Sequence, residues 1–101
     1  MQQDLQGKVF LVTGATEGIG KAAAREFVQR GATLVLVARS AEKGERVRAE
    51  LAALGTQPVH VLLGDLSRLE DVRKVAAAFR ATFDRLDVLV NNAGAIFTQH
   101  Q

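Results

Sequence analysis

The sequence of 101 residues contains no cysteine, no tyrosine and no tryptophan, and it has a single proline, Pro58. Without cysteine, the chain can form neither a disulfide framework nor a thiolate metal site. Its two histidines, His60 and His100, are too few and too isolated to suggest a metal site. No apolar run approaches the roughly 20 residues that span a membrane. We therefore expect a cytoplasmic protein without a membrane span.

A concentration of charge of one sign is also missing. Thirteen Lys and Arg residues against eleven Asp and Glu residues leave a net charge of +2, and the two signs are interspersed, as in segment 42–50. This distribution gives no reason to expect a nucleic-acid-binding patch. With 48% hydrophobic residues, the chain is expected to form one domain at most, large enough to bury a core.

Glycine, in contrast, is concentrated where the apolar run 9–12 gives way to a helical pattern. The segment Thr13–Gly20 reads TGATEGIG and has three glycines within positions 14–20. Glycines let a ligand approach the backbone closely and permit turns that other residues resist. The helix start that follows offers free N–H groups and the positive end of a dipole, which suit a phosphate. The segment predicts a nucleotide site, with a tight strand-to-helix turn lacking a ligand as the alternative.

Short apolar runs alternate with amphipathic segments along the whole chain. The expected strands are 8–13, 33–38, 59–63 and 87–91, and the expected helices are 18–30, 40–54 and 67–83. This alternation predicts right-handed βαβ units and an α/β fold, a Rossmann-type doubly wound parallel sheet in partial form, with helices on both faces. The expected strand order is 3-2-1-4, with a ligand crevice between the carboxyl ends of the first and fourth strands.

Apolar periodicity predicts the buried side of each helix. The expected buried positions are Ile19, Ala23 and Phe27 in the first helix, Val47, Leu51 and Leu54 in the second, and Val72, Val75, Ala76, Phe79 and Phe83 in the third. Ser40 is the expected N-cap of the second helix, and Ser67 with Glu70 has the spacing of a capping box. Segment 1–7 is expected to be disordered or to follow the sheet edge, and segment 95–101 has no periodicity that predicts an element.

Three motifs in register carry a resemblance to a known family. They are Thr13-Gly14-x-x-x-Gly18-Ile19-Gly20, Asp65-Leu66 after the third strand, and Asn91-Asn92-Ala93-Gly94 after the fourth. In order and spacing this set resembles the N-terminal signature of the short-chain dehydrogenase/reductase family. The sequence around Glu42-Lys43-Gly44-Glu45 and Ala95-Ile96-Phe97 is most similar to that of retinol-dehydrogenase-like members.

The resemblance implies a dinucleotide cofactor and a role for each matching residue. It implies that Gly14, Gly18, Ile19 and Gly20 approach the phosphates and ribose, with Thr16 in the same cofactor-binding set. It also implies that Asp65 accepts a hydrogen bond from the adenine amino group and that Leu66 contacts the ring. Asn91 would steady the sheet, and Asn92, Ala93 and Gly94 would line the adenosine ribose side. A plain turn at Asp65 and an ordinary loop at 92–94 are the alternatives.

Arg39 bears on the choice between NADP(H) and NAD(H). In dinucleotide folds an acidic residue after the second strand binds the 2′-hydroxyl of NAD, whereas an arginine there can pair with the 2′-phosphate of NADP. The second strand here is followed by Arg39 and Ser40, so we expect NADP(H) rather than NAD(H). Glu17 weighs against a strong preference, because some NADP-using relatives carry a base at that position. A solvated charge is the alternative for Arg39.

The resemblance covers the chain but less than half of a family domain. The family's chemistry uses a Tyr-x-x-x-Lys pair, and this chain has no tyrosine, so no catalytic and no metal-binding residue is assigned. We expect residues 1–101 to be a single partial cofactor-binding domain of an enzyme that transfers hydride between the cofactor and a small carbonyl or secondary alcohol. The alternative is a naturally truncated, non-catalytic module for nucleotide binding or for interaction with another chain. Its fourth strand would be an exposed edge, open to a homo-oligomer or a complementing chain.

Overall fold

The computed structural model describes residues 4–15, 18–91 and 95–98. Within these residues strands and helices alternate up to β4, and a fifth strand follows. The strands are β1 (Val9–Thr13), β2 (Thr33–Ala38), β3 (Val59–Leu63), β4 (Val88–Asn91) and β5 (Ala95–Thr98). The helices are α1 (Gly18–Gln29), α2 (Ala41–Ala52) and α3 (Leu69–Thr82).

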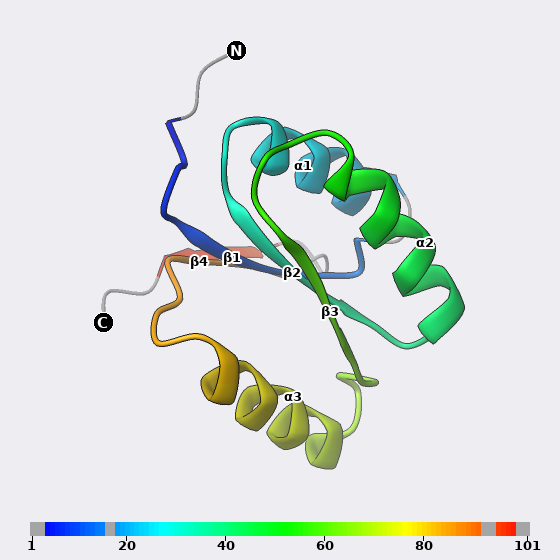
Figure 1. Ribbon diagram of the computed structural model, residues 1–101. Coiled ribbons are helices and arrows are strands. Elements are labelled where there is room, and N and C mark those ends of the chain that lie inside the picture. The colour runs from blue at the N-terminus through cyan, green and yellow to red at the C-terminus, as the bar shows by residue number, and fades with distance from the viewer. Residues whose placement is uncertain (1–3, 16–17, 92–94, 99–101) are drawn as a thin grey trace.

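The strands form one sheet in the order β3-β2-β1-β4-β5. The first four are parallel, and Val12 of β1 is in register with Leu36 of β2 and Val90 of β4. Helices α1 and α2 cover one face of the sheet and α3 covers the other (Figure 1). The predicted α/β class, the strand order 3-2-1-4 and the two helical layers are therefore confirmed.

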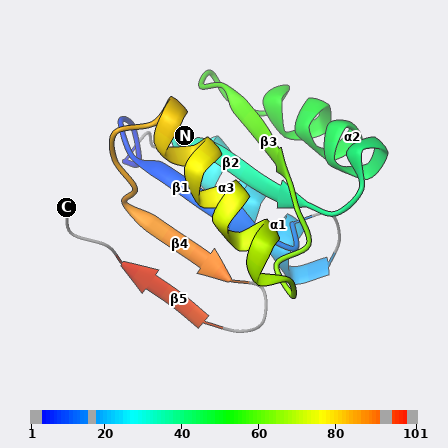
Figure 2. The ribbon, with the colours of Figure 1, turned by 90° about the horizontal axis from the view of Figure 1, so that it is seen from below.

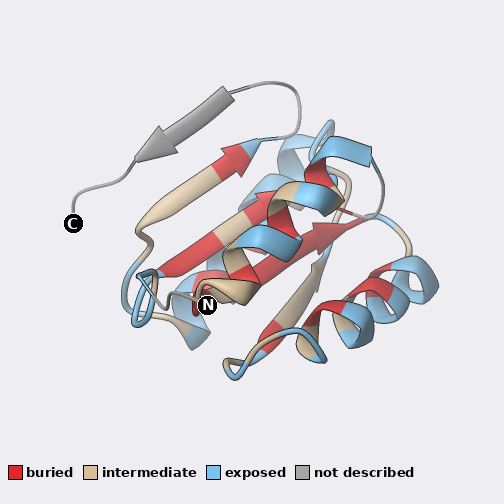
Figure 3. Ribbon diagram, turned by 90° about the horizontal axis from the view of Figure 1, so that it is seen from above, coloured by how far each residue is buried: buried red, intermediate tan, exposed pale blue. Residues whose placement is uncertain are grey.

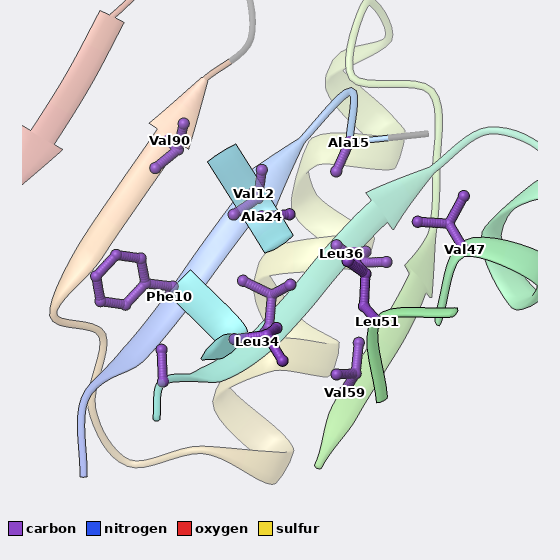
Figure 4. Packing of buried hydrophobic residues seen from close by; sticks show 12 residues of the cluster. Phe10, Val12, Ala15, Ala24, Leu34, Leu36, Val47, Leu51, Val59 and Val90 are labelled. Atoms are coloured by element: carbon purple, nitrogen blue, oxygen red, sulfur yellow. The ribbon is translucent and has the colours of Figure 1, made fainter. Parts of the chain in front are cut away.

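The main core lies between the sheet and the layer of α1 and α2. β1 and β2 are the most continuously buried strands (Figure 3), as expected of central strands covered on both faces. Phe10 and Val12 of β1 and Leu34 and Leu36 of β2 belong to this cluster, which Leu51 of α2 joins (Figure 4). This packing fixes the two strands whose carboxyl ends carry the glycine turn and Arg39.

The predicted buried side of α1 is wrong by one residue. The buried positions are Gly20, Ala24 and Val28, whereas Ile19 is 85% exposed. Small residues at 20 and 24 let the helix axis come close to the sheet, so this stripe faces inward. The bulkier Phe27 lies at its margin, half-buried, with its ring centroid 4.5 Å from that of Phe10.

In the other two helices one predicted position in each is exposed, and Ala76 and Phe83 on the α3 side are only half-buried. Val47 and Leu51 of α2 and Val75 and Phe79 of α3 are buried, as expected. Leu54 is 37% exposed, because α2 ends at Ala52 and the residue lies beyond its last turn. Val72 is 39% exposed, because it borders a hollow that no described element fills.

The predicted capping box at the start of α3 is not formed. The N-cap is Arg68, which makes no side-chain capping bond. The Ser67 hydroxyl instead donates to Asp65 Oδ1 over 2.6 Å. An ionised carboxylate accepts a stronger hydrogen bond than a neutral group does. The Ser67 hydroxyl therefore bonds to Asp65 and does not cap the start of α3.

Residues 4–7 are not disordered. Leu5 N–H donates to the Arg30 carbonyl at the end of α1 (2.9 Å), and Asp4 forms an ion pair with Arg30. The side chain of Leu5 packs against the main core. These contacts tie the segment before β1 to α1; residues 1–3 lie outside the described part.

The segment after β4 forms a strand that the sequence did not predict. β5 pairs antiparallel with β4, and Asn91 is in register with Ala95 (Figure 2). β4 offers free backbone groups along its outer side, and an antiparallel neighbour needs only a short connection. Within the described residues the sheet edge beyond β4 is therefore occupied by β5, and the expectation that β4 is an exposed edge is wrong.

Candidate functional site

The carboxyl ends of the four parallel strands meet at one edge of the sheet. There Thr13 Oγ1 of β1 lies 3.5 Å from the Val90 carbonyl oxygen and 3.3 Å from Asn91 Oδ1 of β4. These contacts join the two strands at the point where the order of the sheet reverses, and parallel α/β folds bind ligands at such points.

The glycine turn leaves β1 at this edge and opens α1. Gly14 and Gly18 have φ of +63° and +65°, which favours glycine over any residue with a Cβ. A Cβ built on Gly18 would meet no atom within 4 Å, so the space beside Gly18 is open. The first turn of α1 contains no acidic residue. Its backbone N–H groups and dipole can therefore take up an anion at this end.

Ile19, next to this turn, is an apolar side chain left almost fully in solvent. Its 85% exposure is the highest among the large hydrophobic side chains that the structure records as exposed. Burying such a side chain is worth about 1.5–3 kcal/mol. A ligand that covers Ile19 would gain part of that free energy.

Arg39 and Ser40 follow β2 at the same edge. Ser40 Oγ accepts a hydrogen bond from Lys43 N–H (3.2 Å) and so caps α2, which confirms the predicted N-cap. The hydroxyl proton of Ser40 is still available for donation. Arg39 is exposed, and its guanidinium forms no salt bridge with any residue in the described part of the chain.

Asp65 follows β3 and keeps its charge. Hydrogen bonds from the side chain and the backbone N–H of Ser67 hold the pKa of the Asp65 carboxyl below its usual value, and the positive charges of Arg39 and Arg68 lower this pKa further. Ala38 at the end of β2 is in register with Leu63 at the end of β3, so Arg39 and Asp65 follow adjacent strand ends. The site therefore combines a cationic group and an anionic group on neighbouring strand ends.

Leu66 borders a shallow apolar hollow of about 200 Å³ on the α3 side of this edge. Thr13, Val37, Leu89 and Asn91 from the ends of three strands also line it. An apolar hollow beside a few polar groups is typical of small-molecule sites.

The structure therefore brings most of the predicted site residues to one edge. Gly14, Gly18, Ile19 and Gly20 lie at the β1–α1 junction, Arg39 and Ser40 after β2, and Asp65 and Leu66 after β3. Thr16, Asn92, Ala93 and Gly94 lie outside the described residues. The sequence did not predict that Ser67 donates two hydrogen bonds to the Asp65 carboxylate, or that the Asp65 N–H donates to the carboxylate of Asp71. The Asp-x-Ser spacing was the signal for the first, because such side chains bond to backbone nearby.

The order of the sheet and the glycine turn at its reversal define a Rossmann-type α/β fold. A family model of the short chain dehydrogenases matches residues 8–101. The chain belongs to the short chain dehydrogenase family.

Similar proteins support this membership. Human retinol dehydrogenase 11 is 47% identical over 93 residues, which cover 91% of this chain and 29% of that protein. The 11-beta-hydroxysteroid dehydrogenase A of Sesamum indicum is 46% identical over 92 residues, which cover 91% of this chain and 26% of that protein. The structure of L-sorbose reductase from Gluconobacter frateurii, in complex with NADPH and L-sorbose, matches with a TM-score of 0.84 and 36% identity. That match covers 94% of this chain and 36% of the reductase.

The chain thus spans between a quarter and a third of the length of these two curated relatives. Among the helices of the described residues, none has both the length and the apolar character required to cross a membrane.

Proposed function

We propose that residues 1–101 form the NADP(H)-binding part of an oxidoreductase, which transfers hydride between the nicotinamide and a carbonyl or secondary alcohol. The observation that carries this proposal is the meeting of the glycine turn and Arg39 at one edge of the sheet. The likeness to a reductase with bound NADPH and to a retinol dehydrogenase supports it.

The residues at this edge suit such a cofactor. Gly14 and Gly18 have positive φ, and the space beside Gly18 is open, which suits a pyrophosphate at the start of α1. Asp65 is an ionised acceptor that suits the adenine amino group, and Leu66 offers an apolar contact for the ring. The remaining assignments of this proposal are Thr16, Ile19 and Gly20 beside the phosphates, Ser40 beside Arg39, and Asn92, Ala93 and Gly94 on the ribose side.

In the bound state the nicotinamide would donate or accept the hydride. The described residues would bind and orient the adenosine half of the cofactor. The family's Tyr-x-x-x-Lys pair has no counterpart in a chain without tyrosine. We therefore propose that these 101 residues bind the cofactor without turnover. Appreciable NADPH-dependent carbonyl reduction by the pure chain would overturn this part of the proposal.

The cofactor preference is tested by Arg39→Asp. A charge-assisted hydrogen bond contributes about 1.5–3 kcal/mol, so the affinity for NADPH should fall roughly 10- to 100-fold. The affinity for NADH, which lacks the 2′-phosphate, should hold or rise. Fluorescence titration with both dinucleotides measures the ratio.

Arg46→Asp is the matched control, because Arg46 is an exposed arginine on α2 whose partner is Glu42. It should leave the ratio of the two affinities unchanged. An unchanged ratio in Arg39→Asp would refute a contact between Arg39 and the 2′-phosphate.

A further inference from the structure

Asp65 lies in the connection between β3 and α3, and its backbone is hydrogen-bonded to a residue of α3. The backbone N–H of Asp65 donates to Asp71 Oδ2 over 2.7 Å, in a partly buried bond between residues six apart. We infer that Asp71 is a positioning residue for adenine recognition by Asp65. This inference rests on the proposed cofactor-binding function.

Close packing makes this bond part of a tight connection. A Cβ on Gly64 would lie 2.8 Å from Val75 Cγ2 and 3.7 Å from Asp71 Cβ, so only glycine lets the strand end come this close to α3. The N–H of Gly64 donates to the Ala38 carbonyl at the end of β2 (2.9 Å). The start of the connection is thus fixed both to α3 and to the residue before Arg39.

The side chain of Asp65 is oriented by a second set of bonds. Its Oδ1 accepts from Ser67 N–H (3.0 Å) and from Ser67 Oγ (2.6 Å). Its Oδ2 accepts no hydrogen bond from the described residues. Asp71 holds the backbone of Asp65 and Ser67 holds one carboxylate oxygen, so the other oxygen stays available for a donor at the site.

The chemistry of adenine fits this acceptor. The 6-amino group of adenine donates hydrogen bonds, whereas hypoxanthine carries at position 6 a carbonyl oxygen, which only accepts; its donor on this edge is the N1–H of the neighbouring ring atom, out of line with an acceptor held opposite position 6. A carboxylate held in place should therefore favour adenine and disfavour hypoxanthine. If Asp71 were lost, the N–H of Asp65 would lack its acceptor, the connection would relax, and the carboxylate would discriminate less.

The experiment compares the affinities of the chain for NADPH and for its hypoxanthine analogue. The wild type should favour NADPH at least about tenfold, since the analogue leaves the carboxylate without its donor. Asp71→Ala should bring the ratio of the two affinities close to one, and Asp71→Asn, which keeps an acceptor oxygen, should preserve part of it. Because both affinities are measured on the same sample, the folded fraction cancels from the ratio.

Glu70→Gln is the matched control, because Glu70 is an exposed acid in the same helical turn whose partner is Lys74. It should leave the ratio unchanged. If Asp71→Ala lowers both affinities in parallel and keeps the wild-type ratio, Asp71 has a merely structural role and the inference is overturned. If circular dichroism shows that Asp71→Ala does not fold, Asp71→Asn is the test. A reduced ratio of the affinities for NADPH and its hypoxanthine analogue then supports the inference, and an unchanged ratio overturns it.

The wild type separates this inference from the proposed function. A wild-type chain that binds neither dinucleotide contradicts the proposed function itself. Equal binding of both leaves cofactor binding intact, but it shows that Asp65 does not recognise adenine and overturns the inference.

Discussion

The amino ends of the strands carry charged groups that are bonded to one another and to the backbone. Asp87, just before β4, accepts from Arg85 and also from the N–H of Val9 at the start of β1, in a partly buried bond (2.7 Å). Asp4 pairs with Arg30 where α1 leads into β2. These charges join segments that are distant in the sequence, and their polar atoms are engaged within the fold.

The carboxyl ends differ in that respect. Arg39 forms no salt bridge in the described part of the chain, and the Asp65 carboxylate has one oxygen engaged by Ser67. The glycine turn adds backbone groups, with open space beside Gly18. The same fold thus uses charge for its own stability at one end and leaves it available for a cofactor at the other. Substitutions at the two ends should separate stability from binding.

The largest expected effect is at the amino end. Asp87→Ala removes a charged acceptor and leaves the Val9 N–H without its partner in a partly buried bond, which should lower the free energy of unfolding by about 2–3 kcal/mol. Urea denaturation measures it. Asp84→Ala, an exposed acid nearby, should change stability by less than about 0.5 kcal/mol. A lowered NADPH affinity of the folded protein, with stability intact, would contradict the structural role of Asp87.

Two glycines test the comparison directly. Gly7, before β1, and Gly18 both have positive φ, and neither has an atom within 4 Å of a built Cβ. Alanine at either should lower stability by about 1–2 kcal/mol. Only Gly18→Ala should also weaken NADPH binding, by roughly tenfold or more, because its methyl group would stand where the phosphates approach. Fluorescence titration measures the NADPH affinity of both variants. Equal losses of affinity in Gly7→Ala and Gly18→Ala would contradict a cofactor site at the carboxyl ends of the strands.

Two substitutions of Ser40 should separate stability from cofactor binding, with smaller effects. Ser40→Ala removes the N-cap of α2 and should cost about 1 kcal/mol, whereas Ser40→Asp keeps a capping oxygen and should retain stability. The added carboxylate should repel a 2′-phosphate at Arg39, so Ser40→Asp should weaken NADPH binding and spare NADH. If NADPH affinity is unchanged in Ser40→Asp, the phosphate does not lie beside Arg39 and Ser40.

The smallest expected effect is a dependence on pH. The hydrogen bond from Arg85, together with that from Val9 N–H, holds the pKa of Asp87 below its usual value. Because the pKa is lower in the folded than in the unfolded state, this stability is present above about pH 4 and is lost as the pH falls through the folded pKa. The urea stabilities of the wild type and Asp87→Asn should therefore converge toward low pH. A constant difference between them from pH 7 to pH 3 would contradict this.

Much of the fold follows from local patterns. Apolar runs predicted β1 to β4 because buried parallel strands are continuously hydrophobic. β5 was missed because its pairing comes from the free edge of β4 and not from its own sequence. The buried side of α1 was misplaced because small residues at 20 and 24, not the largest apolar ones, set how the helix meets the sheet.

The sequence predicted the location of those site residues that follow a strand. Arg39 and Asp65 could be placed at one edge because each follows a parallel strand. The hydrogen bond between Asp65 N–H and Asp71 could not be predicted, because it depends on how closely Gly64 lets the β3–α3 connection pack against α3. The cofactor-binding roles of all the site residues stay predictions, as do the preference for NADP(H), the cytoplasmic location and the homo-oligomer or complementing chain.

The most direct test is an NMR titration of the ¹⁵N-labelled chain with adenosine 2′,5′-bisphosphate. This ligand carries the adenine ring and the 2′-phosphate without the nicotinamide half. We expect amide shifts at Gly14, Gly18, Arg39 and Asp65, with the amides of Leu5, Val9 and Asp87 unmoved. No shifts at all, or shifts centred on the amino ends of the strands, would contradict a cofactor site at the carboxyl edge.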